Sequence, residues 1–268
     1  MNENAPTSSA AATPGRRQWL GHVASAAVTT VAAAALTGRQ AGAADAPQSP
    51  ATAGQGTLPN PIVMMPAWQL SREIHAGHLS CRQVMTAYLA HIDRVNPKVN
   101  AIVALRDRDV LMREAAAADE ALAAGKAGGW MHGMPQAPKD LALTRGIRTT
   151  FGSPIFKDNV PTTDAIVVER ARRAGAILLG KTNTPEFGLG SQTFNTVYGA
   201  TRNPYDLGKA AGGSSGGAAS ALAMRLLPVA DGSDFGGSLR NPAGFCNVYG
   251  FRPSMGRVPY GPTAEVFI

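Results

Sequence analysis

The pattern of apolar and polar positions first becomes regular near residue 80. Ser80 followed by Gln83 fits a capping box, in which two side chains satisfy the free backbone amides at the start of a helix. Apolar residues then recur at helical spacing, which predicts a helix to about Arg94 with one buried face: Val84, Tyr88, Leu89 and Ile92. Asn96-Pro97 is expected to end this helix.

A second helix is predicted from Arg106 to Ala124, because this stretch is charged, rich in alanine and stopped by Gly125. Beyond it, short apolar runs alternate with helical windows; the runs are 176–179 and 226–230, and the windows are 164–174 and 217–225. Strand-like runs separated by helices favour an α/β fold. We therefore expect a mixed, largely parallel sheet flanked by helices.

The first 66 residues carry a different pattern. Arg16-Arg17 precede an apolar, alanine-rich run from Val23 to Leu36, and Ala41-Gly42-Ala43 follow it. This order is typical of a secretory signal, and the paired arginines resemble a twin-arginine signal, which exports folded proteins to the periplasm or beyond. The run is too short and too weakly apolar for a stable membrane span.

These features predict three segments. Residues 1–44 are expected to be the signal peptide, with a disordered tail as the alternative, and 45–66 to be a linker or extended arm. Residues 67–268 are expected to form the folded domain. The protein is then expected to be periplasmic or secreted.

Composition and charge narrow the class of protein. The 268 residues are 44% hydrophobic and 16% charged, so the chain can bury a full core and is not disordered or collagen-like. The net charge of +7 lies in no block of like charges, and no aromatic-plus-basic pattern points to RNA, so no nucleic-acid partner is expected. The two cysteines, Cys81 and Cys246, lack metal spacing and are interpreted as packing thiols.

Two glycine-rich motifs match known sequence patterns but lack the structural context that the function of each pattern requires. Gly175 to Thr182 reads as a phosphate-binding loop, but its interior is an apolar strand rather than a loop that exposes amides. Gly212 to Gly216 contains the G-x-S-x-G of α/β-hydrolases, which needs a histidine later in the chain. Every histidine precedes Ser214, so we expect no Ser-His-Asp triad. The same five histidines supply no credible set of metal ligands, so no metal site is expected either: His22, His75, His78, His91 and His132.

A third glycine-rich segment, 231–242, contains Gly236-Gly237-Ser238. Successive glycines let backbone amides converge on one point, so Ser238 could be a nucleophile beside its own oxyanion hole. Taken alone, the segment is better explained by a tight turn capped by a serine.

The interpretation changes when three motifs are combined: Pro138-Lys139-Asp140, Gly-Gly-Ser214-Ser-Gly-Gly and Gly-Gly-Ser238-Leu-Arg. Together they resemble the amidase signature family. The resemblance runs from about Trp68 to Tyr260, through Lys181-Thr-Asn-Thr-Pro-Glu186, Asn203-Pro204-Tyr205 and Gly250-Phe-Arg-Pro253. It implies the amidase signature fold and a serine hydrolase that cleaves amide carbon–nitrogen bonds through an acyl-enzyme, without a cofactor.

The resemblance also implies a Ser-Ser-Lys triad. Lys139 would be the base, Ser214 the bridging serine, following a cis peptide bond, and Ser238 the nucleophile. An ammonium cannot accept a proton, so Lys139 is expected to be buried and substantially neutral. The oxyanion would be held by successive backbone amides, those of Phe235, Gly236, Gly237 and Ser238.

Further residues around the triad follow from the same resemblance. Gly188, Leu189 and Gly190 would line the pocket for a small-molecule amide, with room for a bulky acyl or aryl group. Four residues would orient their neighbours, with plain structural hydrogen bonding as the alternative for the aspartates: Asp140, Ser215, Asp234 and Arg240. A homodimer is left open.

Family members continue well past the position of Ile268, so we expect the chain to match their N-terminal part and the fold to be incomplete at the C-terminus. An uncovered sheet edge and core face would give low solubility and weak or absent activity. The alternatives to an active amidase are a catalytically inactive fragment and a protein similar to the amidase-like subunit of an amidotransferase. An export signal argues against the second, whose partners are cytoplasmic.

Overall fold

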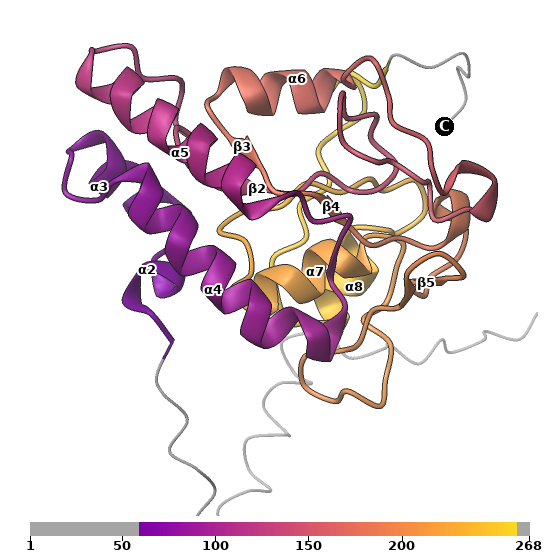
Figure 1. Cartoon of the computed structure of the whole chain (residues 1–268). Helices are drawn as coiled ribbons and strands as arrows, with labels where there is room; N and C mark the ends of the chain where they lie inside the picture. Colours follow the sequence, from indigo (N-terminus) through magenta and orange to yellow (C-terminus); the bar gives the residue numbers. More distant parts are fainter. Residues whose placement is uncertain (1–58, 262–268) are drawn as a thin grey trace, which may run out of the picture. The chain divides into compact units, whose positions relative to one another are not determined.

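The computed structural model describes residues 59–261, which combine helices with short strands (Figure 1). The predicted signal peptide, 1–44, lies outside the described residues. The α-helices are α2 (Pro61–Met64), α3 (Ala67–His75), α4 (Cys81–Val99), α5 (Arg108–Ala123), α6 (Ile166–Arg173), α7 (Gly216–Ala223) and α8 (Arg240–Phe245). Two 3-10 turns are η1 (Pro154–Phe156) and η2 (Glu186–Gly188).

Helix α4 begins as the sequence predicts. The Ser80 hydroxyl accepts the Gln83 amide at 3.0 Å and the Gln83 side chain accepts the Ser80 amide at 2.9 Å, which completes the capping box. The predicted apolar face is confirmed, because all four of its members are buried: Val84, Tyr88, Leu89 and Ile92.

The predicted end of α4 is wrong, since the helix continues through Pro97 to Val99. Pro97 removes one backbone donor from the last turn, and the helix nevertheless continues through it. Asn96 accepts the amides of Ala101 and Ile102 at 3.0 and 2.8 Å, which fixes the chain just beyond the helix. Asn100 takes the left-handed conformation with φ 51° and ends the helix there.

Helices α4 and α5 pack side by side (Figure 1). Asp107 caps α5 by accepting the Val110 amide at 3.0 Å, and the helix ends before Gly125, which has a positive φ of 70°. The predicted second helix is therefore confirmed to within two residues at each end. From α5, Asp119 accepts the Cys81 amide at 2.6 Å, so this helix also stabilises the start of α4.

The α/β class is confirmed, and the fold is partial: within residues 59–261 the short strands form three two-stranded sheets, one parallel and two antiparallel, where a largely parallel sheet was expected. The strands are β1 (Ile102–Val103), β2 (Pro135–Gln136), β3 (Ile177–Leu178), β4 (Lys181–Thr182), β5 (Phe194–Asn195) and β6 (Gly199–Ala200). Strands β2 and β3 pair in parallel, whereas β1 with β4 and β5 with β6 are antiparallel. A further parallel bridge joins Lys139 to Thr182 and extends the parallel region toward the predicted base.

Two expectations fail locally. Residues 226–230 form no strand, because Pro228 removes a backbone donor and Arg225 bends the chain with φ 58°. The buried side chains of Leu226 and Leu227 pack into the core instead. Of the arm predicted over 45–66, residues 45–58 lie outside the described residues. The prediction is wrong for its last part, which forms helix α2 with Val63 buried against the same core.

The two cysteines are buried and free, as interpreted from the sequence. Burial raises the pKa of the Cys81 thiol to about 12 and that of Cys246 to about 11, so both remain protonated at neutral pH. Within residues 59–261, no helix combines the length and the apolar character needed to cross a bilayer.

Candidate active site

Lys139 lies just after β2, where the bridge to Thr182 holds its backbone. Its side chain is buried, and the residue is 2% exposed. The ammonium nitrogen contacts three hydroxyl oxygens: Ser214 Oγ at 2.6 Å, Ser215 Oγ at 2.9 Å and Ser233 Oγ at 2.9 Å. The structure thus brings the predicted base and the predicted bridging serine into direct contact.

Burial changes the acid–base behaviour of this lysine. Removal from water disfavours the charged form and lowers the pKa of Lys139 to about 7, while Asp231 and Asp234 act in the opposite direction. A large fraction of the side chain is therefore neutral at physiological pH. A neutral amine beside a hydroxyl can accept its proton, which is the condition for general-base chemistry.

Close packing of glycines positions Ser214 and Ser215. The Gly213–Ser214 peptide is cis, as the sequence resemblance implied, and α7 begins directly after Ser215. A Cβ atom on Gly217 would lie 2.3 Å from the Asn183 amide nitrogen, so only glycine lets the first turn of α7 approach that backbone. The hydroxyl of Thr193 accepts the Gly216 amide at 3.0 Å and fixes the same turn.

Ser238 lies on a loop that Asp234 organises from within. The Asp234 carboxylate accepts the amides of Gly237 at 2.7 Å and Leu239 at 3.1 Å, and the Arg240 guanidinium donates to both of its oxygens at 3.0 Å. The guanidinium holds the pKa of Asp234 well below its usual range. Asp234 and Arg240 therefore shape the loop and do not touch the Lys139 amine through a hydrogen bond.

The Ser238 loop also contacts the Ser214 segment directly. The Ser215 amide donates to the Ser238 carbonyl at 3.0 Å, which places the predicted nucleophile beside the predicted relay. Within residues 59–261, no hydrogen bond joins the hydroxyls of Ser238 and Ser214. The observed side-chain contact therefore joins Lys139 and Ser214, and Ser238 is held beside them through its backbone.

The four backbone amides predicted to hold an oxyanion differ in whether each already donates a hydrogen bond within the protein. The Gly237 amide is occupied by Asp234, so the structure does not leave it free as expected. Among the described residues, the amides of Phe235, Gly236 and Ser238 donate to no protein acceptor. Phe235 and Gly236 are also exposed, so three donors remain open at this loop.

The predicted pocket residues lie around η2. A Cβ atom on Gly188 would be 3.7 Å from Ser214 Oγ, and this glycine has φ 72°, so its backbone passes close to the relay. Leu189 is 77% exposed and Gly190 has no neighbour within 4 Å of an added Cβ, so these two open toward solvent. The structure brings Gly188 to the site and leaves Leu189 and Gly190 at its edge.

Asp140 holds a different part of the chain. Its carboxylate accepts the Thr150 hydroxyl at 2.6 Å and the Thr150 amide at 3.1 Å, so it stabilises the loop at 150–152. Ser215, by contrast, touches the lysine amine itself, in agreement with its predicted supporting contact. Lys181 of the phosphate-loop-like motif is buried and donates to the Ala142 carbonyl and the Thr144 hydroxyl, both at 2.6 Å.

Sequence reasoning missed two residues of the site, Ser233 and Asp231. Ser233 is the third hydroxyl on the lysine amine, and Asp231 accepts the Lys139 backbone amide at 3.2 Å. The only general signal was that the amine of a buried lysine needs polar partners, and the sequence does not show which residues provide them.

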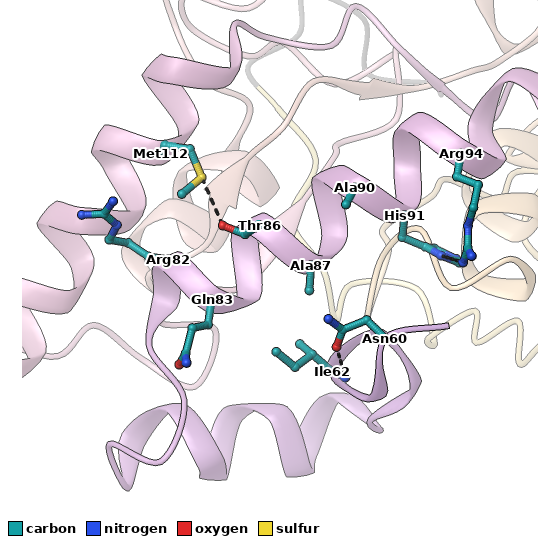
Figure 2. A pocket seen from close by; sticks show the side chains of 10 residues that line it. All are labelled: Asn60, Ile62, Arg82, Gln83, Thr86, Ala87, Ala90, His91, Arg94 and Met112. Carbon is teal, nitrogen blue, oxygen red and sulfur yellow. Dashed lines mark hydrogen bonds between the residues drawn. The ribbon is translucent and has the colours of Figure 1, made fainter. Parts of the chain in front are cut away.

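The structure also bears on two other kinds of site, a metal site and a surface groove. Across residues 59–261, no group of three or more His, Cys, Asp or Glu side chains is arranged to hold a metal ion. A groove of about 690 Å³ follows α4 beside α2 and α5 (Figure 2). Its floor includes Ala87 and Ala90, and none of the candidate site residues lines it.

Comparison with known proteins bears on the same residues. The Amidase family model matches residues 83–267. An acylamidase from Rhodococcus erythropolis is 44% identical over 193 residues, covering 72% of this chain and 40% of the relative. A glutamyl-tRNA(Gln) amidotransferase subunit from Marinobacter nauticus is 44% identical over 201 residues, covering 73% of this chain and 41% of the relative. The chain thus spans about two fifths of the length of these curated relatives.

The fold agrees with this sequence similarity. The crystal structure of a bacterial aryl acylamidase of the amidase signature enzymes superposes with a TM-score of 0.73 at 35% identity, covering 78% of this chain and 43% of that one. A structure of 6-aminohexanoate cyclic dimer hydrolase gives a TM-score of 0.61 at 36% identity, covering 69% and 37%. Together with the matched family model, these similarities show that the chain belongs to the amidase signature family.

Proposed function

We propose that this protein is an amide hydrolase in which Ser238 is the nucleophile, Ser214 the bridging serine and Lys139 the base. The single observation that carries the proposal is the 2.6 Å contact between Lys139 Nζ and Ser214 Oγ in a buried setting. Because burial lowers the pKa of Lys139 to about 7, the amine can act as a base at neutral pH.

The proposed reaction proceeds in two halves. Neutral Lys139 takes the Ser214 proton while Ser214 takes that of Ser238, whose oxygen forms a bond to the amide carbonyl carbon. The protons return along the same path to the nitrogen as the carbon–nitrogen bond breaks and the amine leaves. Water then attacks the acyl-enzyme ester, giving a carboxylic acid and free Ser238. The Ser238 hydroxyl must turn toward Ser214 for the first step, because no hydrogen bond joins them within residues 59–261.

The open amides of the Ser238 loop support the same proposal. Phe235, Gly236 and Ser238 offer donors without acceptors in the described chain, which suits a developing oxyanion. Gly188, which approaches Ser214, and the exposed Leu189 and Gly190 would receive the substrate. We propose a small amide with a bulky acyl or aryl group, consistent with the acylamidase and aryl acylamidase similarity.

A fluorophosphonate probe tests the nucleophile. We expect covalent labelling of the purified full chain at Ser238, located by peptide mass spectrometry, and none in Ser238→Ala. Ser254→Ala removes an exposed serine elsewhere and is the matched control, which should label like the unchanged chain. A folded chain that is not labelled would favour the inactive amidase-like fragment instead, and labelling at another serine would contradict Ser238 as the nucleophile.

The second candidate function is that of an amidotransferase component, favoured by the similarity to the Marinobacter nauticus protein. Both functions begin with the same attack on an amide, so substrate choice separates them. Comparing the release of a chromogenic aniline from an aryl amide with the release of ammonia from glutamine distinguishes the two. Preference for glutamine would support the second candidate.

We also propose that residues 1–44 direct export to the periplasm or beyond. The support is the order of Arg16-Arg17, an apolar run and small residues in the sequence. Fractionation of bacteria expressing the full chain should find it outside the cytoplasm with a new N-terminus near residue 44. Replacing both arginines with lysine should retain the uncleaved chain in the cytoplasm; export of that variant would contradict a twin-arginine route.

A further inference from the structure

The Asp231 side chain contacts the Lys139 backbone. One carboxylate oxygen, Oδ2, accepts the Lys139 backbone amide at 3.2 Å, and the other, Oδ1, accepts the Gln136 side-chain amide at 3.3 Å. Gln136 belongs to β2, and its side-chain oxygen Oε1 accepts the Ala137 backbone amide at 2.8 Å. These contacts fix Asp231, a loop residue, to the strand that precedes Lys139.

Asp231 also belongs to a small set of interacting charges in the interior of the site. It acts on Lys139 together with Asp234, and it acts on Lys181 together with Asp140. Burial raises the pKa of Asp231, whereas the Lys139 amide and the two lysines favour its ionised form. A hydrogen bond to each carboxylate oxygen fits an ionised acceptor, because a protonated carboxyl would place a donor on one side.

We propose that Asp231 is a positioning residue for Lys139, because its carboxylate accepts the lysine backbone amide and its negative charge favours the charged form of the amine. This inference rests on the proposed role of Lys139 as base. Neither function of Asp231 requires contact with substrate. The fixed backbone keeps the amine within reach of Ser214, and the negative charge keeps the amine basic enough to accept a proton efficiently.

The sign of the electrostatic effect follows from the charges. A carboxylate stabilises a nearby ammonium, so removing it lowers the lysine pKa further. A neighbouring charge commonly moves a pKa by about one unit or more, and we expect a decrease of about one pH unit for Lys139 in Asp231→Asn. A role limited to shape would leave the Lys139 pKa unchanged, because asparagine has nearly the same shape as aspartate.

The direct measurement is an NMR titration of the full chain carrying lysine labelled with 13C at Cε. The Lys139 resonance is assigned by its loss in Lys139→Met. We expect Asp231→Asn to lower its midpoint by about one pH unit, Asp231→Glu to restore it, and the exposed control Asp158→Asn to leave it in place. An unchanged or raised midpoint in a folded Asp231→Asn chain would overturn the proposal.

If Asp231→Asn does not fold, Gln136→Leu provides the test, because it removes a hydrogen bond that favours the ionised carboxylate. A smaller decrease of the Lys139 midpoint would support the proposal, and no decrease would overturn it. In the same variants, the acidic limb of the probe-labelling rate should move to lower pH and the plateau should fall. A loss of labelling at every pH without movement of the limb would show that Asp231 supplies no charge to the amine, and it would overturn the proposal. Should the unchanged chain not label at all, the proposed function fails, while the titration still decides the role of Asp231.

Discussion

Replacement of Lys139 by methionine gives a test of its buried, neutral state that does not depend on catalysis. In the folded chain the pKa of Lys139 lies at about 7, below the ordinary value of 10.5 that it regains on unfolding. Between these values the unfolded chain binds more protons than the native chain, so stability rises with pH across this window. Below about pH 7 both states are protonated and this contribution is constant. Methionine has a similar length and carries no proton.

The magnitude follows from the size of the pKa difference. Each pH unit inside the window is worth about 1.4 kcal/mol. From pH 7.5 to 9.5, the free energy of unfolding of the unchanged chain should rise by roughly 2.5 kcal/mol more than that of Lys139→Met. Lys181, whose pKa burial lowers to about 8, titrates in both chains, so its contribution cancels in the difference. In Lys139→Met, the three serine hydroxyls lose the lysine amine as a partner. This loss changes the free energy of unfolding of the variant by an amount that varies little with pH.

Urea unfolding followed by circular dichroism at half-unit pH intervals supplies both curves. The quantity of interest is the difference between the two free energies of unfolding, plotted against pH. A difference that grows in favour of the unchanged chain as pH rises is the expected result. Parallel curves would show that Lys139 keeps an ordinary pKa, and a difference that shrinks would show a raised one. Either result would remove the physical basis for a lysine base.

Two further predictions concern the packing around the site. Gly217→Ala should destabilise the chain by about 3 kcal/mol or prevent folding, because its Cβ would lie 2.3 Å from a backbone nitrogen. Thermal melts measure the effect, and Gly244→Ala, whose Cβ would meet nothing within 4 Å, is the control and should be neutral. Asp234→Asn should flatten the loss of stability on acidification below about pH 4, since a depressed carboxyl pKa stabilises the native chain above its ordinary value of 3.8 and less as pH falls. Identical acid unfolding curves for the two chains would contradict that assignment.

Local sequence signals predicted the helices and the chemistry-bearing segments well. The Ser80 capping box, the buried face of α4 and the alternation that produced β3 and α6 all follow from short-range rules. Two errors arose where the structure departs from those rules. Helix α4 runs through Pro97 to Val99, and Asn100 beyond it donates to the Tyr198 and Ala200 carbonyls at 2.7 and 3.3 Å. In the apolar run 226–230, Leu226 and Leu227 pack into the core without forming a strand.

The site residues that escaped prediction are those whose role depends on distance in space. Ser233 and Asp231 stand in a segment whose pattern points to its glycines and its nucleophile, and nothing in their spacing points to Lys139. The structure brings them to the lysine because the loop at 231–234 runs past β2 on its way to Ser238. Likewise, the occupied Gly237 amide could not be inferred, because it depends on the direction in which Asp234 turns.

Burial by itself does not make a lysine a base, and this chain contains its own comparison. Lys139 and Lys181 are both buried, and burial lowers both pKa values, to about 7 and about 8. Lys181 contacts a carbonyl and one threonine hydroxyl, and a carbonyl has no proton to give. Lys139 contacts three serine hydroxyls, and two of these serines, Ser214 and Ser215, lie in the segment that binds the Ser238 backbone. Under the proposed mechanism, the difference between a structural lysine and a base therefore lies in whether its acceptors can pass on a proton toward a substrate.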